Sequence, residues 1–279
     1  VMGHIIVNEA EQIMDKQIKV LDKGFVRLVD YYGNDSRIVQ SARVSYGEGT
    51  KTVREDKMLI DYLWMNEHTS PFEQVVFTFH CKLPIFVARQ WIRHRTARVN
   101  EVSGRYSVMK EEFYTPSEDM ISFQSKDNKQ GRSKDEVPAE LKQKVLDIIK
   151  ELNNDSYKSY TEMVEHGIAR ELARVCLPLN LYTEWYWQID LKNLLHFLRL
   201  RLDDHAQYEI REYAKAMAEI VKKVCPYTWE SFEEHTLYST KLSRTESNLL
   251  KDLFSGKEVD KSKTCFKSLA KKLPFIVEK

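Results

Sequence analysis

The sequence predicts an α+β fold, in which helices pack around a central sheet of mainly antiparallel strands. Two segments, 75–83 and 180–189, are rich in aromatic and β-branched residues and indicate strands. Two further short segments, 17–22 and 25–31, indicate a hairpin that turns near Gly24. A hairpin joins antiparallel strands, and helical segments between the other strands complete the α+β pattern.

Helical periodicity accounts for most of the remaining chain. We expect helices at 36–44, 52–66, 84–96, 139–166 with a break, 169–176, 191–201 and 204–224. Ser70 is expected to cap one helical turn, because Pro71 and Glu73 follow it at the spacing of a capping box. Asp203 or Asp204 is expected to cap the last helix, and a following proline to end it.

Three stretches show no regular period. Residues 97–106 contain Ser103 and Gly104 and indicate a loop. Residues 115–136 are polar, and we expect a mobile loop or a lid there. Residues 226–279 are rich in lysine and weakly patterned, so we expect a peripheral helical tail outside a main domain at 1–225.

The composition is that of an ordinary globular protein. The 279 residues are 42% hydrophobic and carry a formal net charge of +1, so no global field favours nucleic acid or an anionic membrane. No apolar run reaches the ~20 residues of a membrane span, and the first residues lack the pattern of a signal peptide. Four widely spaced cysteines indicate a reduced, cytoplasmic protein, and the histidines and cysteines form no metal-binding motif.

Polar groups are unusually dense between residues 89 and 106. Five arginines, one histidine and one carboxylate fall within these 18 residues of a nearly neutral protein. Arginine presents a planar fork of donors that matches phosphate oxygens. Cations at a helix C-terminus also interact favourably with the helix dipole, which explains one or two of the arginines but not the amides, serine and glutamate among them. The segment therefore indicates a site for an anion or a nucleotide.

Two other clusters admit both a structural and a functional interpretation. Residues 196–211 contain Arg201 and His205 but also fit a capped helix with a solvated face. The group of His68, Ser70, Glu73 and Gln74 is also compatible with a capped turn that has no other role. No glycine-rich phosphate loop is present, so any phosphate must be held by side chains, and the surroundings of Ser103 do not form a nucleophile elbow.

The residues from Arg93 to Ser103, RHRTARVNEVS, resemble the signature of flavin-dependent thymidylate synthases, which is Arg-His-Arg, seven residues and then Ser. The resemblance extends over about 17–225 and includes LDKGFVRLVDYYGNDSRIVQSARVSYG, HTSPFEQVVFTFHCKLPIFVARQWIRHR, ARELARVCLPLNLYTEWYW and LRLRLDDHAQYEIREYA. The resemblance implies conversion of dUMP to dTMP, with methylenetetrahydrofolate as carbon donor and FAD, reduced by NADPH, as hydride donor. It also implies an α+β fold like that of this family and a homotetramer whose active sites are shared between subunits.

The resemblance further implies roles for individual residues. The residues implied to contact FAD are His68, Ser70, Glu73, Arg93, His94, Arg95, Thr96, Lys192 and His196. Those implied to bind dUMP are Gln90, Arg93, Glu101, Val102, Ser103, Gly104, Arg105, Arg174 and Arg201, with catalytic roles for Arg201 and Ser103. The chain departs from the family at Asp190, Lys192 and His196, where Asn, Arg and Asn are common, and at Arg98, where a small residue is usual.

Two other functions are compatible with the same residues. In a nucleic-acid-binding module, the arginines would contact phosphates and Trp91, Tyr106 and Trp187 would stack on bases, although such domains are usually basic. In a flavin-binding sensor, FAD would bind without turnover. On the resemblance and the near-neutral charge, we expect dUMP and folate as partners. We expect neither nucleic acid nor a membrane among them.

Overall fold

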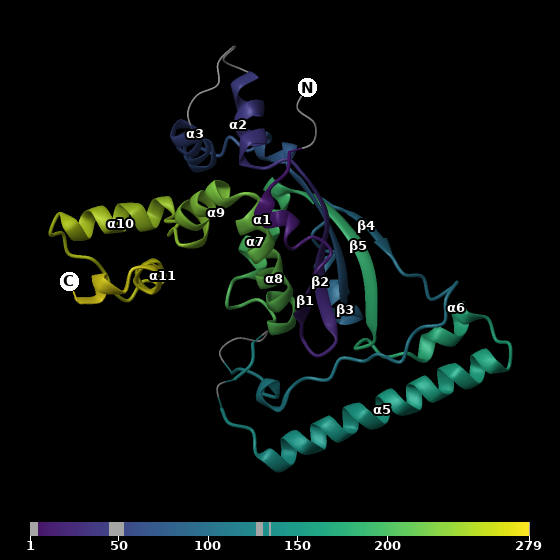
Figure 1. Ribbon diagram of the computed structural model, residues 1–279. Coiled ribbons are helices and arrows are strands. Elements are labelled where there is room, and N and C mark those ends of the chain that lie inside the picture. The colour runs from purple at the N-terminus through teal and green to yellow at the C-terminus, as the bar shows by residue number, and fades with distance from the viewer. Residues whose placement is uncertain (1–4, 45–52, 127–130, 134, 279) are drawn as a thin grey trace. The chain divides into compact units, whose positions relative to one another are not determined.

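The computed structural model describes residues 5–44, 53–126, 131–133 and 135–278 (Figure 1). Contacts divide the chain into two compact units, Val1–Phe232 and Glu233–Lys279. In the part of the chain that is described, no helix has the length and apolar character that crossing a membrane requires. The same residues contain no group of three His, Cys, Asp or Glu side chains placed to hold a metal ion.

A five-stranded antiparallel sheet organises the first unit, which confirms the predicted fold class. The strands are β1 (Gln17–Val20), β2 (Gly24–Tyr32), β3 (Val76–Pro84), β4 (Arg98–Glu101) and β5 (Tyr182–Asp190), in the order β1-β2-β3-β5-β4. The predicted hairpin is β1 and β2, which turn through residues 21–23. The two aromatic segments are β3 and β5, which pair along their whole length.

Helices pack against one face of this sheet. Figure 1 shows α7 (Leu191–Arg201) and α8 (Tyr208–Val224) beside the strands, and the long α5 (Ala139–Glu165) below them. The other elements of this unit are α1 (Asn8–Glu11), α2 (Asp35–Arg43), α3 (Val53–Met65), η2 (Ser70–Gln74), α4 (Ile85–Trp91), η3 (Glu118–Met120), α6 (Arg170–Ala173), η4 (Arg174–Cys176) and α9 (Pro226–Phe232). The expected helices are therefore present, although several differ in extent.

Trp91 is the centre of the aromatic core. Its ring lies 5.4 Å from Trp185 and 5.2 Å from Trp187 on β5, and 4.9 Å from Phe197 on α7. Tyr213 on α8 lies 5.8 Å away on another side. These side chains are fully buried, so the end of α4 is held against the sheet and two helices at once.

Three local expectations were wrong. Residues 98–101 form β4 rather than a loop, because their backbone pairs with β5 from Gln188 to Trp185 although every side chain is exposed. The helix expected at 84–96 ends at Trp91, and α5 runs to Glu165 without a break. Tertiary pairing and helix continuity outweighed the local sequence pattern at these places.

The predicted caps were also wrong. Thr69 precedes η2 and makes no side-chain cap, so Ser70 is the first residue of the turn rather than its cap. The helix α8 begins at Tyr208 instead of residue 204. Asp203 accepts a hydrogen bond from the backbone N–H of His205 within the preceding turn, which occupies the carboxylate expected to cap the helix.

The expected lid, 115–136, is described only in part, since 127–130 and 134 lie outside the described residues. Arg132 forms an ion pair of 2.6 Å with Glu209, a buried residue in the first turn of α8. The carboxylate of Glu209 also accepts a hydrogen bond from the hydroxyl of Tyr114. The ion pair of Arg132 attaches residues 131–133 to α8. A lid function for 115–136 stays a prediction.

The second unit, Glu233–Lys279, is helical where it is described. It contains η5 (Glu233–Leu237), α10 (Arg244–Phe254), α11 (Thr264–Lys272) and η6 (Pro274–Glu278). Phe266, Leu269 and Ile276 form its small core. The helix α9 belongs to the first unit, which therefore extends to Phe232.

Gly24 provides a test of the packing between the hairpin and α8. A Cβ atom at this position would lie 2.1 Å from the Tyr213 hydroxyl and 2.7 Å from the Val20 carbonyl oxygen. Because that hydroxyl donates a 2.7 Å hydrogen bond to the Lys82 carbonyl, Gly24→Ala must shift both the side chain and the backbone. We expect a loss of about 2–3 kcal/mol in the free energy of unfolding of the first unit, measured by denaturant titration.

Gly167→Ala is the matched control in the same unit. Gly167 has a φ of +79° but no atom within 4 Å of an added Cβ. Only backbone strain of about 1 kcal/mol is therefore expected. Equal losses for the two variants would contradict the close packing described for Gly24.

Candidate active site

The turn that follows α4 presents the arginines of the signature. Trp91 is fully buried, whereas Arg93 and Arg95 are exposed, so the core fixes the turn and leaves these side chains outside. The backbone N–H of His94 closes the turn by donating to the Trp91 carbonyl over 2.9 Å. Among the described residues, neither Arg93 nor Arg95 has an acidic partner, so both remain available to an anion.

His94 lies between this turn and α7. Its ring is 5.7 Å from Phe197 and 5.5 Å from the ring of His196. Its Nε2 is 3.3 Å from the Thr96 hydroxyl. Burial, His196 and Arg201 lower the pKa of His94, so the neutral imidazole is favoured at the site.

The start of α7 brings further candidate residues to the same region. Lys192 lies 3.8 Å from Glu73 of η2, and η2 and α7 pack together. His68 precedes η2, and its ring contacts Tyr62 at 5.9 Å. The structure thus collects most of the residues implied to bind FAD on η2, the 92–97 turn and α7.

Asp190 is the N-cap of α7. Its carboxylate accepts hydrogen bonds from the backbone N–H and the side-chain amide of Asn193, at 3.0 and 2.7 Å. Both partners lie within its own helix, which accounts for an acidic residue at this position. Its charge is directed to the helix N-terminus rather than left unpaired beside an anion site.

Arg201 and Gln90 form a second, half-buried group. Arg201 donates from Nη2 to the Gln90 carbonyl over 3.4 Å. Arg201 Nε and Gln90 Oε1 are buried without any hydrogen-bond partner in the described structure. The Nε atom of Arg37 and four indole N–H groups share this lack of a partner, so the partly exposed atoms of the Arg201 and Gln90 side chains, rather than the buried ones, are accessible to a ligand. Burial also lowers the pKa of Arg201.

A third group surrounds the loop after β4. The Glu101 carboxylate accepts a 2.6 Å hydrogen bond from Thr183, and the Val102 N–H donates to the Glu184 carbonyl over 2.9 Å. Ser103 Oγ accepts from the Arg105 N–H over 3.3 Å. Pairing with β5 therefore holds the loop in position.

Arg174 and Arg105 flank this loop. A Cβ atom on the buried Gly104 would meet Arg174 Cδ at 3.3 Å, which places the Arg174 side chain against the loop backbone. Arg174 has no acidic partner in the described part of the chain, whereas Arg105 pairs with Glu171 at 3.1 Å. The pair is half-exposed, so a phosphate can compete for Arg105 at small cost.

The residues implied to bind dUMP form two groups. Gln90 and Arg93 precede β4 in the chain, with Arg201 in contact with Gln90, and the loop that carries Ser103 and contacts Arg174 follows β4. From Arg98 to Glu101 the strand rises about 10 Å. No hydrogen bond or ion pair between described residues joins the two groups.

The donor set fits the cofactor and substrate that the resemblance implies. A flavin dinucleotide carries a pyrophosphate, for which Arg93, Arg95 and Lys192 supply cations, and a ribose, for which Glu73 supplies an acceptor. The partly exposed Gln90 amide and Arg201 guanidinium fit a polar ring such as uracil. By contrast, Trp91 and Trp187 are fully buried and unavailable for stacking on bases, which argues against a nucleic-acid-binding module.

Sequence reasoning missed the residues that hold these groups. Thr183, Glu184 and Glu171 each contact a candidate residue, and Asn193 completes the cap at Asp190. Only the strand register could have revealed the first two, because they are more than 80 residues from their partners. The spacing of Asp190 and Asn193 was a detectable capping signal.

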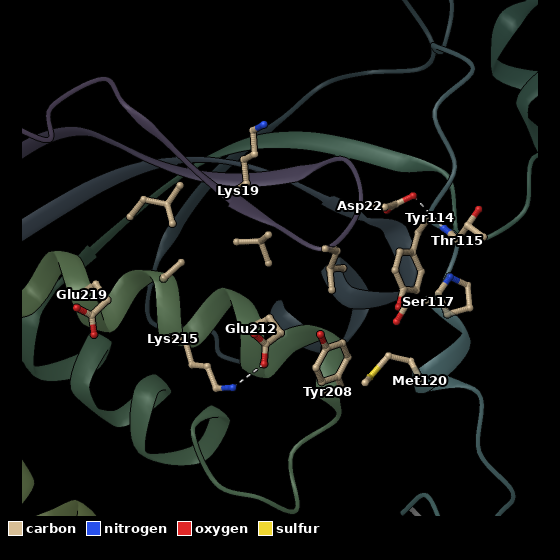
Figure 2. Close-up of a pocket in the computed structure, with 15 residues that line it drawn as sticks. Lys19, Asp22, Tyr114, Thr115, Ser117, Met120, Tyr208, Glu212, Lys215 and Glu219 are labelled. Carbon is tan, nitrogen blue, oxygen red and sulfur yellow. Dashed lines mark hydrogen bonds and ion pairs between the residues drawn. The ribbon is translucent and has the colours of Figure 1, made fainter. Parts of the chain in front are cut away.

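A separate pocket of about 730 Å³ lies between β1, residues 114–120 and α8 (Figure 2). Lys215 and Glu212 pair with each other on its α8 wall, and Asp22 holds the backbone of Thr115 at the opposite side. None of the candidate site residues lines it. We assign no ligand to this pocket.

The described site presents several arginine side chains without acidic partners among the described residues, an arrangement that fits phosphorylated ligands. Comparison with known proteins identifies the family to which the chain belongs. The chain matches the family described as thymidylate synthase complementing proteins over residues 27–227. It is 62% identical over 245 residues to a flavin-dependent thymidylate synthase of Treponema denticola, covering 88% of this chain and 92% of the relative.

Other relatives agree. A flavin-dependent thymidylate synthase of Thermus thermophilus is 58% identical, and the match covers 88% of each chain. A solved structure, the UMP/dUMP methylase PolB of Streptomyces cacaoi bound with 5-Br UMP, superposes with a TM-score of 0.71 at 30% identity, covering 80% of this chain and 99% of that one. The chain belongs to the family of flavin-dependent thymidylate synthases and is an enzyme of the methyltransferase class.

Proposed function

We propose that this chain converts dUMP to dTMP, with methylenetetrahydrofolate as carbon donor and NADPH-reduced FAD as hydride donor. The observation that carries the proposal is that Arg93, in the turn before β4, and Arg174, against the loop after it, have no acidic partner among the described residues. Leaving cations unpaired in a protein of net charge +1 favours an anionic ligand. The relatives' name and the PolB structures bound with 5-Br UMP and 5-Br dUMP support the same substrate class.

The substrate phosphate is assigned to Arg93, Ser103, Arg105 and Arg174. Ser103, Arg105 and Arg174 of one subunit and the Arg93 position of a neighbouring subunit would together neutralise and orient the dianion, which fixes the uracil ring relative to the flavin. Gln90, Glu101, Val102 and Gly104 are assigned to the nucleoside; the small Gly104 lets the ligand approach the loop backbone. Arg105 exchanges its contact with Glu171 for the phosphate.

Arg201 is assigned to the uracil ring. Activation of ring carbon 5 places negative charge on a carbonyl oxygen, and a half-buried guanidinium stabilises that charge effectively. Ser103 orients the substrate from the loop after β4. Both are positioned before reaction, Arg201 by the end of α7 and Ser103 by the strand pairing of β4.

FAD is assigned to His68, Ser70, Glu73, Arg93, His94, Arg95, Thr96, Lys192 and His196. When bound and reduced, the flavin supplies the hydride that completes the methyl group. The residues of this chain bind the pyrophosphate, hold the ring system beside α7 and exclude water from it.

A homotetramer with shared active sites accounts for the separation of the two substrate-binding groups. Leu172 and Val175, on either side of Arg174, are 61% and 76% exposed, which is unusual for apolar side chains beside a polar site. Contact with a neighbouring subunit would cover them and bring Arg174 to a partner's Gln90–Arg201 group.

We also assign the protein to the cytoplasm.

Replacing Arg174 separates substrate binding from cofactor binding. Arg174→Ala removes a charge-assisted contact to the phosphate, so dUMP affinity should fall by about 10- to 150-fold while FAD stays bound. Calorimetric titration with dUMP measures the loss, and flavin absorbance measures the bound FAD. Arg244→Ala, which removes the same charge from the second unit, is the control. Unchanged dUMP affinity in the Arg174 variant would show that the assignment is wrong.

The cysteines predict a mechanism without an enzyme thiolate. Burial raises the pKa of the Cys81 and Cys225 thiols, which disfavours a nucleophilic thiolate. The Cys176 thiol lies 3.2 Å from the Ala173 carbonyl oxygen, and Cys265 belongs to the second unit. None of these positions supplies an activated nucleophile to the candidate site.

A variant with all four cysteines replaced by Ala or Ser should therefore still form dTMP. Some stability is lost where a buried thiol is removed, so turnover is compared per folded, flavin-loaded subunit. The four single variants serve as controls. If one of them bound FAD and dUMP but made no dTMP, catalysis would depend on that thiol and the mechanism proposed here would fail.

A further inference from the structure

One face of α7 forms a cationic stripe beside the proposed flavin site. Lys192, His196 and Arg199 follow one another at spacings of four and three residues, so their side chains lie along the same side of the helix. The His196 ring is 5.5 Å from the ring of His94, which belongs to the turn after α4. Arg93 and Arg95 of that turn add two further cations without acidic partners in the described chain.

The charges around His196 favour its neutral form. Burial, Arg199 and Lys192 lower the pKa of His196, the first by desolvation and the other two by repulsion. The acidic groups of the neighbouring elements are engaged elsewhere. Asp190 caps its own helix through Asn193, and Glu73 of η2 lies nearest Lys192. In the ligand-free chain these effects favour the uncharged imidazole of His196.

His196 also has no hydrogen-bond partner among the described residues, in contrast to His94. The latter is engaged with the Thr96 hydroxyl and with the backbone of Asn193. These contacts fix the orientation of the His94 ring. Of the two imidazoles, His196 is the one whose nitrogen atoms are open to a ligand and to a proton.

We propose that binding of FAD is coupled to the uptake of one proton by His196, which then pairs with the pyrophosphate. This inference rests on the proposed function, because it takes FAD as the ligand. In the free chain, Arg199 and Lys192 disfavour the protonated form of His196. A bound pyrophosphate brings two negative charges that offset this repulsion. Opposite charge within about 4–6 Å favours the charged form of a histidine, so proton and cofactor bind together.

The coupling fixes the sign of the pH dependence. The pKa of His196 is higher in the complex than in the free chain, so the extra affinity for FAD is fully present at low pH. It is lost as the pH rises through the pKa of the complex. Between the two pKa values the affinity falls by up to about tenfold per pH unit, the limit for one coupled proton. An asparagine, common in the family at this position, cannot supply this dependence.

Calorimetric titration of the full-length, cofactor-free protein with FAD tests the inference. At one pH near 7.5, the observed enthalpy is measured in several buffers that differ in ionisation enthalpy, and the slope gives the protons taken up. The titration is then repeated across pH 6.5–9. The variants are His196→Asn and His196→Gln, and His166→Asn at the end of α5 is the matched control.

We expect net proton uptake by the wild-type protein and the His166 variant, with FAD affinity that weakens as the pH rises. Both His196 variants should bind FAD with clearly less proton uptake and a flatter pH dependence, converging with the wild type at high pH. Equal uptake in wild type and both His196 variants, or none in the wild type, would overturn the coupling while leaving FAD binding intact. A protein that binds no FAD would instead overturn the proposed function as well.

Discussion

The packing of Trp91 is the interaction on which the rest of the site depends. One side chain closes α4 against two tryptophans of β5, a phenylalanine of α7 and a tyrosine of α8. Removing a buried aromatic of this size typically costs about 3–5 kcal/mol, a large share of a domain's stability. Because the signature arginines follow Trp91 directly, the apolar core determines where these cations lie.

Several polar residues near this core lack interaction partners among the described residues. The core is closely packed, although the indole N–H groups of Trp91, Trp185 and Trp187 lack hydrogen-bond partners, as do one atom each of Gln90 and Arg201. The arginines Arg93, Arg95 and Arg174 near it have no acidic partner among the described residues. Such an arrangement reduces stability and is retained where a ligand supplies the missing partners. The carboxylates nearby are used structurally, as Asp190 shows by capping α7. This distribution of charge is the arrangement that the proposed anionic ligands require.

Much of this architecture could be predicted from the sequence. The strands β3 and β5 carry aromatic and β-branched runs, and the hairpin has a turn signal, so the sheet and its antiparallel sense followed from local patterns. The strand β4 could not be predicted, because its four side chains are all exposed and only pairing with β5 makes it a strand. The cap expected at Asp203 failed for a similar reason, since a turn to His205 competed for the same carboxylate. For the site, the signature identified the arginines and His94, but Thr183 and Glu184 are brought to the loop only by strand register.

The central claim is that the unpaired cations around Trp91 and β4 bind a flavin dinucleotide and dUMP together. The most direct measurement is the visible absorption spectrum of the purified protein, titrated first with FAD and then with dUMP. The account predicts a stable flavin spectrum whose bands shift when dUMP is added, because the two ligands share Arg93 and lie in one site. A colourless protein that binds no added FAD, or bound flavin whose spectrum is unchanged by saturating dUMP, would contradict it.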